Sequence, residues 1–353
     1  MKHDFIYEAL PSRVVFGQGK LSTLPAEAER LGVKRILVLS TPAQVKWAEE
    51  VAQTLGNASA GVFSQATMHT PVDVSEQAVA YAKSVDADCV LGLGGGSTIG
   101  LGKAIALRTG LPQIAVPTTY AGSEMTPILG ETKDGVKTTQ RTMAVLPKTV
   151  IYDVNLSLSL PVGLSATSGL NAMAHAMEAL YSQDRNPITS LYAEEGIAAL
   201  GRALPILVKD TANAAARADA LYGAWLCGIC LGTSGMALHH KLCHVLGGAF
   251  DLPHSETHAV MLPHTVAYNM HAAADVISRA ARALQTDNAA LGFWELGRRI
   301  GAPSSLRELG MPESGIDHAV ALALKNPYWN PEPLQEDKLK ALITRAWGGE
   351  APV

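Results

Sequence analysis

The segment DCVLGLGGGS, residues 88–97, joins an apolar run to three consecutive glycines. The run up to Leu93 is typical of a buried strand, and the pattern over 97–108 is typical of a helix. Glycines let backbone N–H groups approach an anion because no Cβ stands in the way, and a helix N-terminus adds positive potential. The segment therefore predicts a phosphate cradle with Ser97 as the helix cap, or else a tight strand-to-helix turn. It is not the G-x-G-x-x-G fingerprint, since Ser97 stands where the third glycine belongs.

Further strands and helices surround this segment. Residues 35–40 and 113–117 are predicted strands, and residues 43–55 are a predicted helix. Strands that alternate with helices indicate a parallel sheet with helices on both faces. After about residue 155 helical patterns replace the strands, over 169–181, 188–200, 215–231 and 272–284. We therefore predict an α/β domain over residues 1–154, followed by an all-α domain over residues 155–353.

The composition limits the classes of function. The chain has 353 residues, 48% of them hydrophobic, and 28 Lys and Arg against 32 Asp and Glu give a net charge of −4. This apolar content excludes a disordered chain, and the weak negative charge argues against nucleic acid or a membrane surface as the partner. No apolar stretch has the length of a membrane span, and the N-terminus is broken by charge and proline, unlike a secretory signal. With only four Cys, these features predict a cytoplasmic protein without a disulfide framework.

Hydroxyl groups follow two of the predicted strands. Thr118 and Thr119 come directly after one strand, and Ser40 and Thr41 end another. Hydroxyls at the carboxyl end of a strand suit a ribose, a phosphate or an amide, although an ordinary polar loop has the same composition. No Asp or Glu stands at Ser40 or Thr41 to bind both ribose hydroxyls, which leaves the choice between NADH and NADPH open.

Histidines are concentrated in one part of the chain. Six of the 11 lie between residues 239 and 264. Histidine can bind a metal or exchange protons near neutral pH. Single histidines are ordinarily core or surface residues, but several at helical spacing predict a polar active site. Three pairs have the spacing of four residues that places both members on one helix face: Asn171 with His175, His240 with His244, and His254 with His258.

A metal at this site is the first alternative to consider. The three imidazoles of His175, His240 and His254 would be enough for zinc in some catalytic sites. The fourth donor would be Asn171, which is neutral. A carboxylate there would have offset half of the charge of a dication, so its absence disfavours a hard Fe(II) ion. We therefore predict no metal at this site.

Several motifs, taken together, resemble the iron-containing alcohol dehydrogenase family. They are GGGS (94–97), Pro-Thr-Thr (117–119), Gly-Ser-Glu (122–124), GLNAMAHAMEAL (169–180) and HKLCHVLGGAFDLPHSETHAVMLPH (240–264). The resemblance runs in order through most of the chain and ends at Asn330-Pro331-Glu332-Pro333. It implies a dinucleotide-binding α/β domain followed by a helical catalytic domain, and it implies a homodimer.

Three departures set the chain apart from the metal-dependent members of that family. Asn171 stands where they carry Asp, Gly100 where many carry Asp, and His258 where they usually carry Asn. With the runs HHKLCH (239–244) and PTTYAGSE (117–124), these departures resemble the maleylacetate reductase branch. That branch reduces the C=C bond of maleylacetate to 3-oxoadipate in aromatic compound degradation and is regarded as needing no metal. The resemblance therefore implies an oxidoreductase that uses NADH or NADPH and acts on a small dicarboxylate.

The resemblance also implies roles for individual residues. The residues expected to bind the cofactor are Gly94, Gly95, Gly96 and Ser97 at its pyrophosphate, with Thr41, Thr118, Thr119 and Lys137 along it. His244 matches the family's non-metal active-site histidine near the nicotinamide. We expect the catalytic residues to be His175, His240, His244 and His254, and the residues that bind the substrate to be Asn171, Lys241 and His258.

The chemistry of this reaction is compatible with an amide, instead of a carboxylate, at position 171. Hydride addition to maleylacetate leaves an enolate, which hydrogen-bond donors and a protonated histidine can stabilise and protonate without a metal. The main alternative is an alcohol dehydrogenase or aldehyde reductase of the same family that depends on Fe or Zn. Further alternatives are a lyase resembling dehydroquinate synthase, which uses NAD transiently, and a non-enzymatic module that kept the fold.

Overall fold

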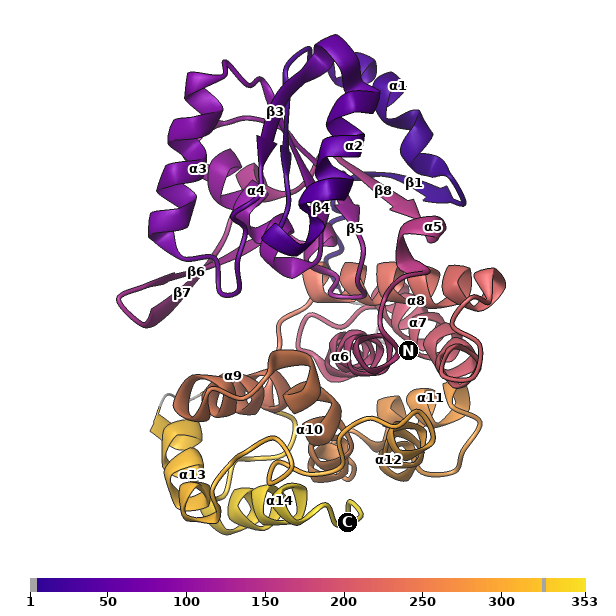
Figure 1. Cartoon of the computed structure of the whole chain (residues 1–353). Coiled ribbons are helices and arrows are strands. Elements are labelled where there is room, and N and C mark those ends of the chain that lie inside the picture. The colour runs from indigo at the N-terminus through magenta and orange to yellow at the C-terminus, as the bar shows by residue number, and fades with distance from the viewer. Residues whose placement is uncertain (1–4, 326–327) are drawn as a thin grey trace. The chain divides into compact units, whose positions relative to one another are not determined.

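The computed structural model describes residues 5–325 and 328–353, without the side chain of Lys137. These residues form two compact units (Figure 1). Ala9–Leu158 is one unit, and Ser159–Val353 together with the described residues before Ala9 is the other. The first unit is built around a parallel sheet, and the second is helical. The predicted fold class, an α/β part followed by an all-α part, is thereby confirmed.

Six parallel strands form the sheet of the α/β unit, in the order β1-β8-β5-β4-β2-β3. The strands are β1 (Arg13–Gly17), β2 (Ile36–Leu39), β3 (Ser59–Phe63), β4 (Cys89–Gly94), β5 (Gln113–Pro117) and β8 (Thr149–Asp153). The helices are α1 (Leu24–Leu31), α2 (Val45–Leu55), α3 (Val72–Ser84), α4 (Gly96–Thr109) and α5 (Val154–Ser157). A separate antiparallel hairpin consists of β6 (Ile128–Lys133) and β7 (Val136–Arg141). The three strands predicted from the sequence are β2, β4 and β5, which are neighbours in the sheet.

Alternate residues of β2 pack on opposite faces of the sheet. Ile36 and Val38 pack with residues of α1 and α2, whereas Leu37 and Leu39 pack with residues of α3 and α4. Successive side chains of a strand point to opposite faces, so an all-apolar strand is buried on both. Helices therefore cover both faces, as predicted. Since the strands are parallel, the loops after β2, β4 and β5 leave from the same edge of the sheet.

The helical unit consists, over the described residues, of long helices packed on one another. They are α6 (Val162–Tyr181), α7 (Pro187–Leu207), α8 (Ala214–Thr233), α9 (Leu238–Phe250), α10 (His254–Asn269), α11 (Ala274–Ala283), α12 (Ala289–Arg299), α13 (Ile316–Lys325) and α14 (Glu336–Gly348). The four helices predicted from the sequence correspond to α6, α7, α8 and α11. Among the described helices, none alone is long and apolar enough to cross a membrane, while α8 and α9 pass that test as a pair bent by 94°.

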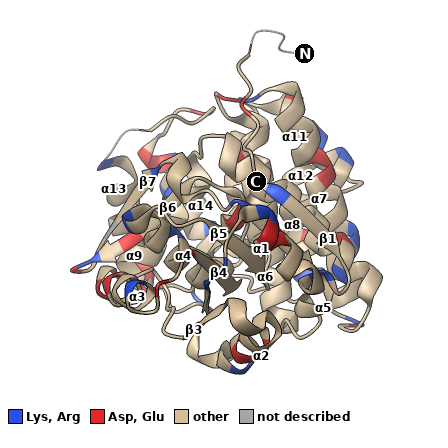
Figure 2. Ribbon diagram, turned by 90° about the horizontal axis from the view of Figure 1, so that it is seen from above, with Lys and Arg blue, Asp and Glu red and all other residues tan. Residues whose placement is uncertain are grey.

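Charged residues are distributed over both units. Figure 2 shows basic and acidic residues interspersed along the elements, in keeping with the net charge of −4. Ion pairs join nearby elements, such as Arg13 with Glu27 (3.0 Å) and Arg279 with Glu194 (2.8 Å). Pairs of this partly exposed kind contribute at most about 1 kcal/mol each, so apolar packing is the main source of stability.

Arg217 of α8 is fully buried in the helical unit. Its guanidinium donates hydrogen bonds to the carbonyl oxygens of Thr211 (3.1 Å) and Leu160 (3.0 Å) and to Ser165 Oγ (2.7 Å). A buried charge is stable only when its hydrogen bonds are satisfied. These contacts therefore hold the start of α6 against α8.

Replacing Arg217 with Leu is expected to lower the free energy of unfolding by about 3 kcal/mol, because buried acceptors lose their donor. Urea unfolding followed by circular dichroism measures this loss. Arg299→Leu, at the exposed end of α12, is the control and should change the free energy by no more than about 0.5 kcal/mol. An Arg217→Leu variant as stable as the parent protein would show that the buried guanidinium does not hold these helices together.

Candidate active site

The glycine loop connects β4 to α4 in the α/β unit. Gly95 occupies the N-cap of α4 and no side chain caps the helix, so the prediction that Ser97 caps it is wrong. Ser97 lies inside the first turn. Gly94 has φ +150°, and a Cβ there would meet Thr98 Oγ1 at 2.6 Å and Gln44 Oε1 at 2.8 Å. The loop therefore requires glycine at position 94, and it leaves the uncapped amides of the first turn available to an anion.

Gln44, which was not predicted from the sequence, links the ends of the two strands that flank β4. Its Nε2 donates to Thr118 Oγ1 (3.2 Å), and Thr41 Oγ1 donates to its Oε1 (3.3 Å). Gln44 thus links Thr41 after β2 with Thr118 after β5, beside Gly94 at the end of β4. Its position in the turn that follows a predicted strand was the signal available in the sequence.

Further polar groups lie at the same edge of the sheet. Ser40 Oγ and Thr98 Oγ1 are buried and have no hydrogen-bond partner among the described residues. Such atoms usually bind a water or a ligand. Thr119 Oγ1 lies 3.2 Å from the Cβ position of Gly95. Uncapped amides, glycines and neutral hydroxyls fit a pyrophosphate and a ribose, while the side chain of Lys137 lies outside the described structure.

Three helices bring the predicted histidines together. The rings of His175 (α6) and His240 (α9) stack with their centroids 5.0 Å apart, and the ring of His258 (α10) lies 4.9 Å from that of His240. His254 is 4.4 Å and His239 is 4.8 Å from His258, between ring centroids. We call these five side chains the imidazole cluster. Buried polar atoms here without a hydrogen-bond partner in the described structure are His175 Nδ1, His240 Nε2, His258 Nε2 and, on α6, Asn171 Oδ1.

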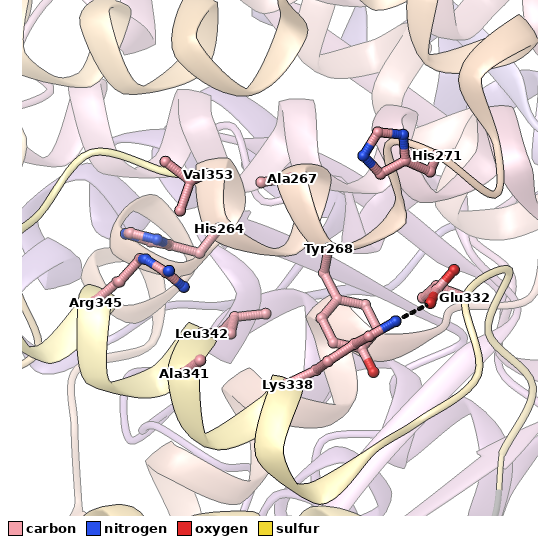
Figure 3. A pocket seen from close by; sticks show the side chains of 10 residues that line it. All are labelled: His264, Ala267, Tyr268, His271, Glu332, Lys338, Ala341, Leu342, Arg345 and Val353. Carbon is pink, nitrogen blue, oxygen red and sulfur yellow. Dashed lines mark hydrogen bonds and ion pairs between the residues drawn. The ribbon is translucent and has the colours of Figure 1, made fainter.

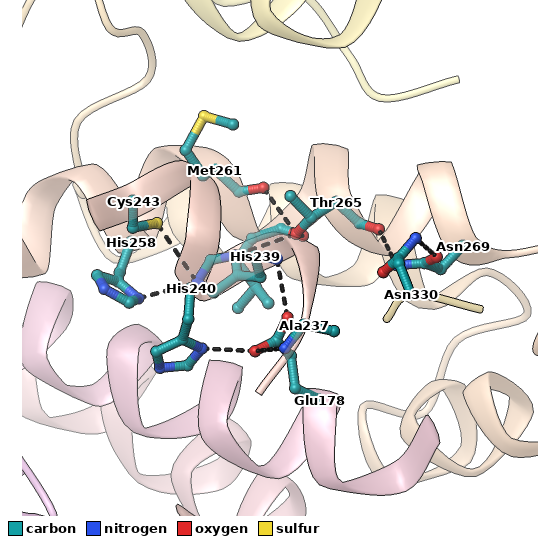
Figure 4. Close-up of polar contacts among 11 residues, drawn as sticks. Glu178, Ala237, His239, His240, Cys243, His258, Met261, Thr265, Asn269 and Asn330 are labelled. Carbon is teal, nitrogen blue, oxygen red and sulfur yellow. Dashed lines mark hydrogen bonds and ion pairs between the residues drawn. The ribbon is translucent and has the colours of Figure 1, made fainter. Parts of the chain in front are cut away.

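Glu178 of α6 is a second functional residue that was not predicted from the sequence. Its carboxylate accepts hydrogen bonds from His240 Nδ1 (2.6 Å) and from the backbone N–H groups of Ala237 (3.1 Å) and His239 (2.8 Å), as Figure 4 shows. These amides begin α9, where a negative charge is stabilised. With Nδ1 bound to Glu178, Nε2 is the nitrogen that His240 offers to a ligand. The i, i+3 spacing from His175 to Glu178 was the signal available in the sequence.

His239, which is not among the predicted site residues, belongs to a buried chain of hydrogen bonds. Its Nε2 lies 2.9 Å from His258 Nδ1, and its Nδ1 lies 3.0 Å from Thr265 Oγ1 (Figure 4). The Thr265 hydroxyl donates to the carbonyl oxygens of Met261 and Leu262 (3.1 and 3.0 Å), so it accepts from His239 Nδ1–H. His239 Nε2 then accepts from His258 Nδ1–H. This order leaves a lone pair on the unpartnered His258 Nε2, which costs less than a buried orphan N–H.

Burial keeps three of these imidazoles neutral. The pKa values of His175, His239 and His258 are lowered well below the ordinary value. The main cause is burial, which disfavours the charged form, and neighbouring imidazoles add to the shift. At neutral pH these three rings are therefore neutral hydrogen-bonding groups.

Other predicted residues lie at the margin of the cluster. His244 and His254 are exposed in the helical unit, and the ring of His244 lies 6.2 Å from that of His240, between centroids. Lys241 Nζ lies over the ring of Tyr328, 5.5 Å from its centroid, in a cation–π contact. The structure thus brings His244 beside the cluster and directs Lys241 toward an aromatic ring.

The residues at the family's metal-ligand positions do not fit an iron ion. Asn171 offers a neutral amide where a hard Fe(II) ion prefers a carboxylate. Within the described residues, one group places three possible ligand atoms within 4.8 Å of one another, and it consists of His239, Cys243 and His258. His175, His240 and His254 do not form such a group.

A pocket of about 440 Å³ lies elsewhere in the helical unit, beside α10 and α14 (Figure 3). His264 and Arg345 line it together with Lys338, whose Nζ pairs with Glu332 Oε1 at 2.5 Å. Burial, aided by Arg345, lowers the pKa of His264 to about 4. None of the predicted site residues lines this pocket, so His264 is separate from the imidazole cluster.

Comparisons with known proteins agree along the whole chain. The family model described as "Iron-containing alcohol dehydrogenase" matches residues 11–154, and "Fe-containing alcohol dehydrogenase family, C-terminal" matches residues 165–347. The chain is 55% identical to a maleylacetate reductase of Rhizobium sp. (strain MTP-10005) and 54% identical to one of Burkholderia cepacia, each over 99% of both chains. A crystal structure of maleylacetate reductase from Agrobacterium tumefaciens has a TM-score of 0.97 at 54% identity, covering 99% of this chain and 100% of that one.

Proposed function

This chain belongs to the iron-containing alcohol dehydrogenase family, and on that premise we propose that it reduces the C=C bond of maleylacetate to give 3-oxoadipate. Relatives that are 53–55% identical over nearly their whole length are named maleylacetate reductases, which supports this substrate. The main structural support for this reaction is the hydrogen bond between His240 and Glu178, which lies beside imidazoles that burial keeps neutral.

The α/β unit provides the site for a nicotinamide cofactor. Bound NADH or NADPH supplies the hydride. Glycines 94–96 and Ser97 bind the pyrophosphate through backbone N–H groups at the start of α4. Thr41, Thr118 and Thr119 offer hydroxyls for the rest of the cofactor. The turn after β2 carries neutral Ser40 and Thr41, so this turn disfavours neither cofactor.

The neutral polar groups of the helical unit stabilise the product of hydride addition. Addition at the carbon β to the ketone leaves an enolate, which is much less basic than the alkoxide of an alcohol dehydrogenase. Preorganised hydrogen-bond donors can stabilise such a charge without a Lewis acid. We assign this role to the Nδ2–H group of Asn171 and to His175, whose buried Nδ1 has no partner among the described residues and can carry the donor hydrogen of the neutral ring.

His240 is the proton donor in this proposal. The second hydrogen arrives as a proton on the carbon next to the ketone, which restores the ketone from the enolate. Glu178 holds His240 Nδ1, so a protonated His240 carries its transferable proton on Nε2. The carboxylate also stabilises the imidazolium, as the acid of a catalytic triad does. His175 and His258 are unsuited to this step because burial keeps them neutral.

The two carboxylates of the substrate require cationic or N–H partners. Lys241 is the cation that we propose for one of them. Its Nζ must leave the ring of Tyr328, at a cost of about 0.5–1 kcal/mol, whereas a hydrogen bond between charged groups returns about 1.5–3 kcal/mol. His254, His258 and His244 are the remaining polar groups in and around the cluster that the substrate can contact.

Metal removal tests this function directly. Protein dialysed against a strong chelator is expected to oxidise NADH or NADPH with maleylacetate at an unchanged rate, because the enolate needs no Lewis acid. The absorbance of the cofactor measures the rate, and mass spectrometry identifies 3-oxoadipate. Activity that returns only with Fe or Zn would instead support the metal-dependent alcohol or aldehyde reductase. Failure to oxidise either cofactor, with or without metal, would overturn the assigned substrate.

A further inference from the structure

Three soft or borderline donors meet on the buried side of the imidazole cluster. His239 and Cys243 lie one turn apart on α9, and His258 faces them from α10. All three side chains are buried, and one donor atom of each lies within 4.8 Å of the others. We propose that these three side chains form a binding site for Zn²⁺ or a similar borderline cation such as Co²⁺. This site is separate from the positions of the family's iron ligands.

The donor distances are close to those of a tetrahedral zinc site. Zinc binds imidazole nitrogen at about 2.0–2.1 Å and thiolate sulfur at about 2.3 Å. Tetrahedral angles then separate two nitrogens by about 3.3 Å, and a nitrogen from a sulfur by about 3.6 Å. The corresponding distances are 2.9 Å between His239 Nε2 and His258 Nδ1, and 3.7 Å between His239 Nε2 and Cys243 Sγ. These two distances must change by only a few tenths of an ångström to bind a cation, and the donors of His258 and Cys243 lie within 4.8 Å of each other.

A hydrogen bond to Thr265 favours His239 as a metal ligand. Thr265 Oγ1 accepts the hydrogen bond from His239 Nδ1–H and thereby leaves a lone pair on Nε2. Metal-binding histidines commonly have such an outer partner, which orients the ring and fixes the tautomer. A thiol beside two imidazoles selects Zn²⁺ or Co²⁺ over the harder Fe(II) and Mg²⁺.

Binding at this site releases one proton. Cys243 is a free thiol, and sulfur coordinates a metal as the thiolate. The thiol proton leaves to solvent when sulfur coordinates the cation. The proton on His258 Nδ1 moves to its Nε2, which has no partner in the described structure. The metal therefore converts His258 Nε2 from an acceptor into a donor.

Cobalt substitution gives a readout that is independent of catalysis. Metal-free full-length protein titrated with Co²⁺ is expected to develop a thiolate-to-cobalt charge-transfer band and to release one proton for each ion bound. Cys243→Ser should abolish the band and weaken binding by more than about tenfold. Cys230→Ser is the matched control, since Cys230 is also buried in a helix but contacts the carbonyl oxygen of Thr189 instead of a histidine. This control should keep the band.

Two further variants distinguish binding at the proposed site from binding at the positions of the family's iron ligands. His175→Gln should keep the cobalt band, whereas His239→Gln should lose it, and thermal unfolding shows whether each variant is folded. If Co²⁺ binds without a thiolate band and His175→Gln abolishes that binding, the family's imidazoles hold the metal and the proposal is wrong. Absence of Co²⁺ binding to the parent protein would overturn it equally.

Discussion

Glu178→Gln is expected to lower kcat by about 10²- to 10⁴-fold, the range of general acid catalysis, with a much smaller change in KM. The substitution leaves one oxygen, which can replace the acceptor of only one of the two backbone N–H groups, because Ala237 N–H bonds Oε2 and His239 N–H bonds Oε1. It removes the charge that stabilises a protonated His240 and that holds its Nδ1 at 2.6 Å. Steady-state kinetics with maleylacetate and a saturating cofactor measure the loss.

The split between kcat and KM distinguishes positioning of His240 from a merely structural role. Loss of the hydrogen bond to His240 Nδ1 should lower kcat even with saturating substrate and cofactor. Loss of the cap on α9 alone would lower the melting temperature and leave kcat of the folded enzyme near that of the parent protein. Glu194→Gln, which removes a half-exposed ion pair with Arg279, is the control and should leave kcat unchanged. Near-normal turnover in Glu178→Gln, together with loss of turnover in His244→Ala, would transfer the acid role to His244.

Gly94→Ala is expected to weaken the binding of NADH and NADPH by more than about tenfold. The backbone at Gly94 has φ +150°, and holding another residue there costs about 1–3 kcal/mol. The new Cβ would also meet Thr98 Oγ1 at 2.6 Å and Gln44 Oε1 at 2.8 Å, so the loop must move away from the threonines. A loss of 1.4 kcal/mol corresponds to about a tenfold change in Kd. Quenching of protein fluorescence by the cofactor measures Kd.

Gly96→Ala is the matched comparison within the same loop. Its Cβ would meet only Ala121 Cβ, at 3.9 Å, so it fits without strain. Gly96→Ala should therefore unfold at the same urea concentration as the parent protein, whereas Gly94→Ala should unfold at a lower one. Equal stability of the two variants would show that the conformation of Gly94 is not strained for other residues.

The elements that carry the site could be predicted from the sequence. Apolar runs placed β2, β4 and β5, and glycine and hydroxyl residues at their ends indicated the cofactor loops. Parallel strands end at one edge, so Thr41, Gly94 and Thr118 come together once the alternation of strands and helices is recognised. The histidine spacing likewise placed His240 with His244 on α9 and His254 with His258 on α10.

The partners of these side chains depend on tertiary packing. Glu178 and His240 are 62 positions apart, and His239 and Thr265 are 26 apart, so no local pattern pairs them. Helical periodicity shows which residues share a face, but it does not show which faces of α6, α9 and α10 pack on one another. That choice results from the sum of many apolar contacts between helices. The sequence alone thus determined the elements and their chemistry, whereas the structure decided that Glu178 bonds His240 and that His239 joins Cys243 and His258.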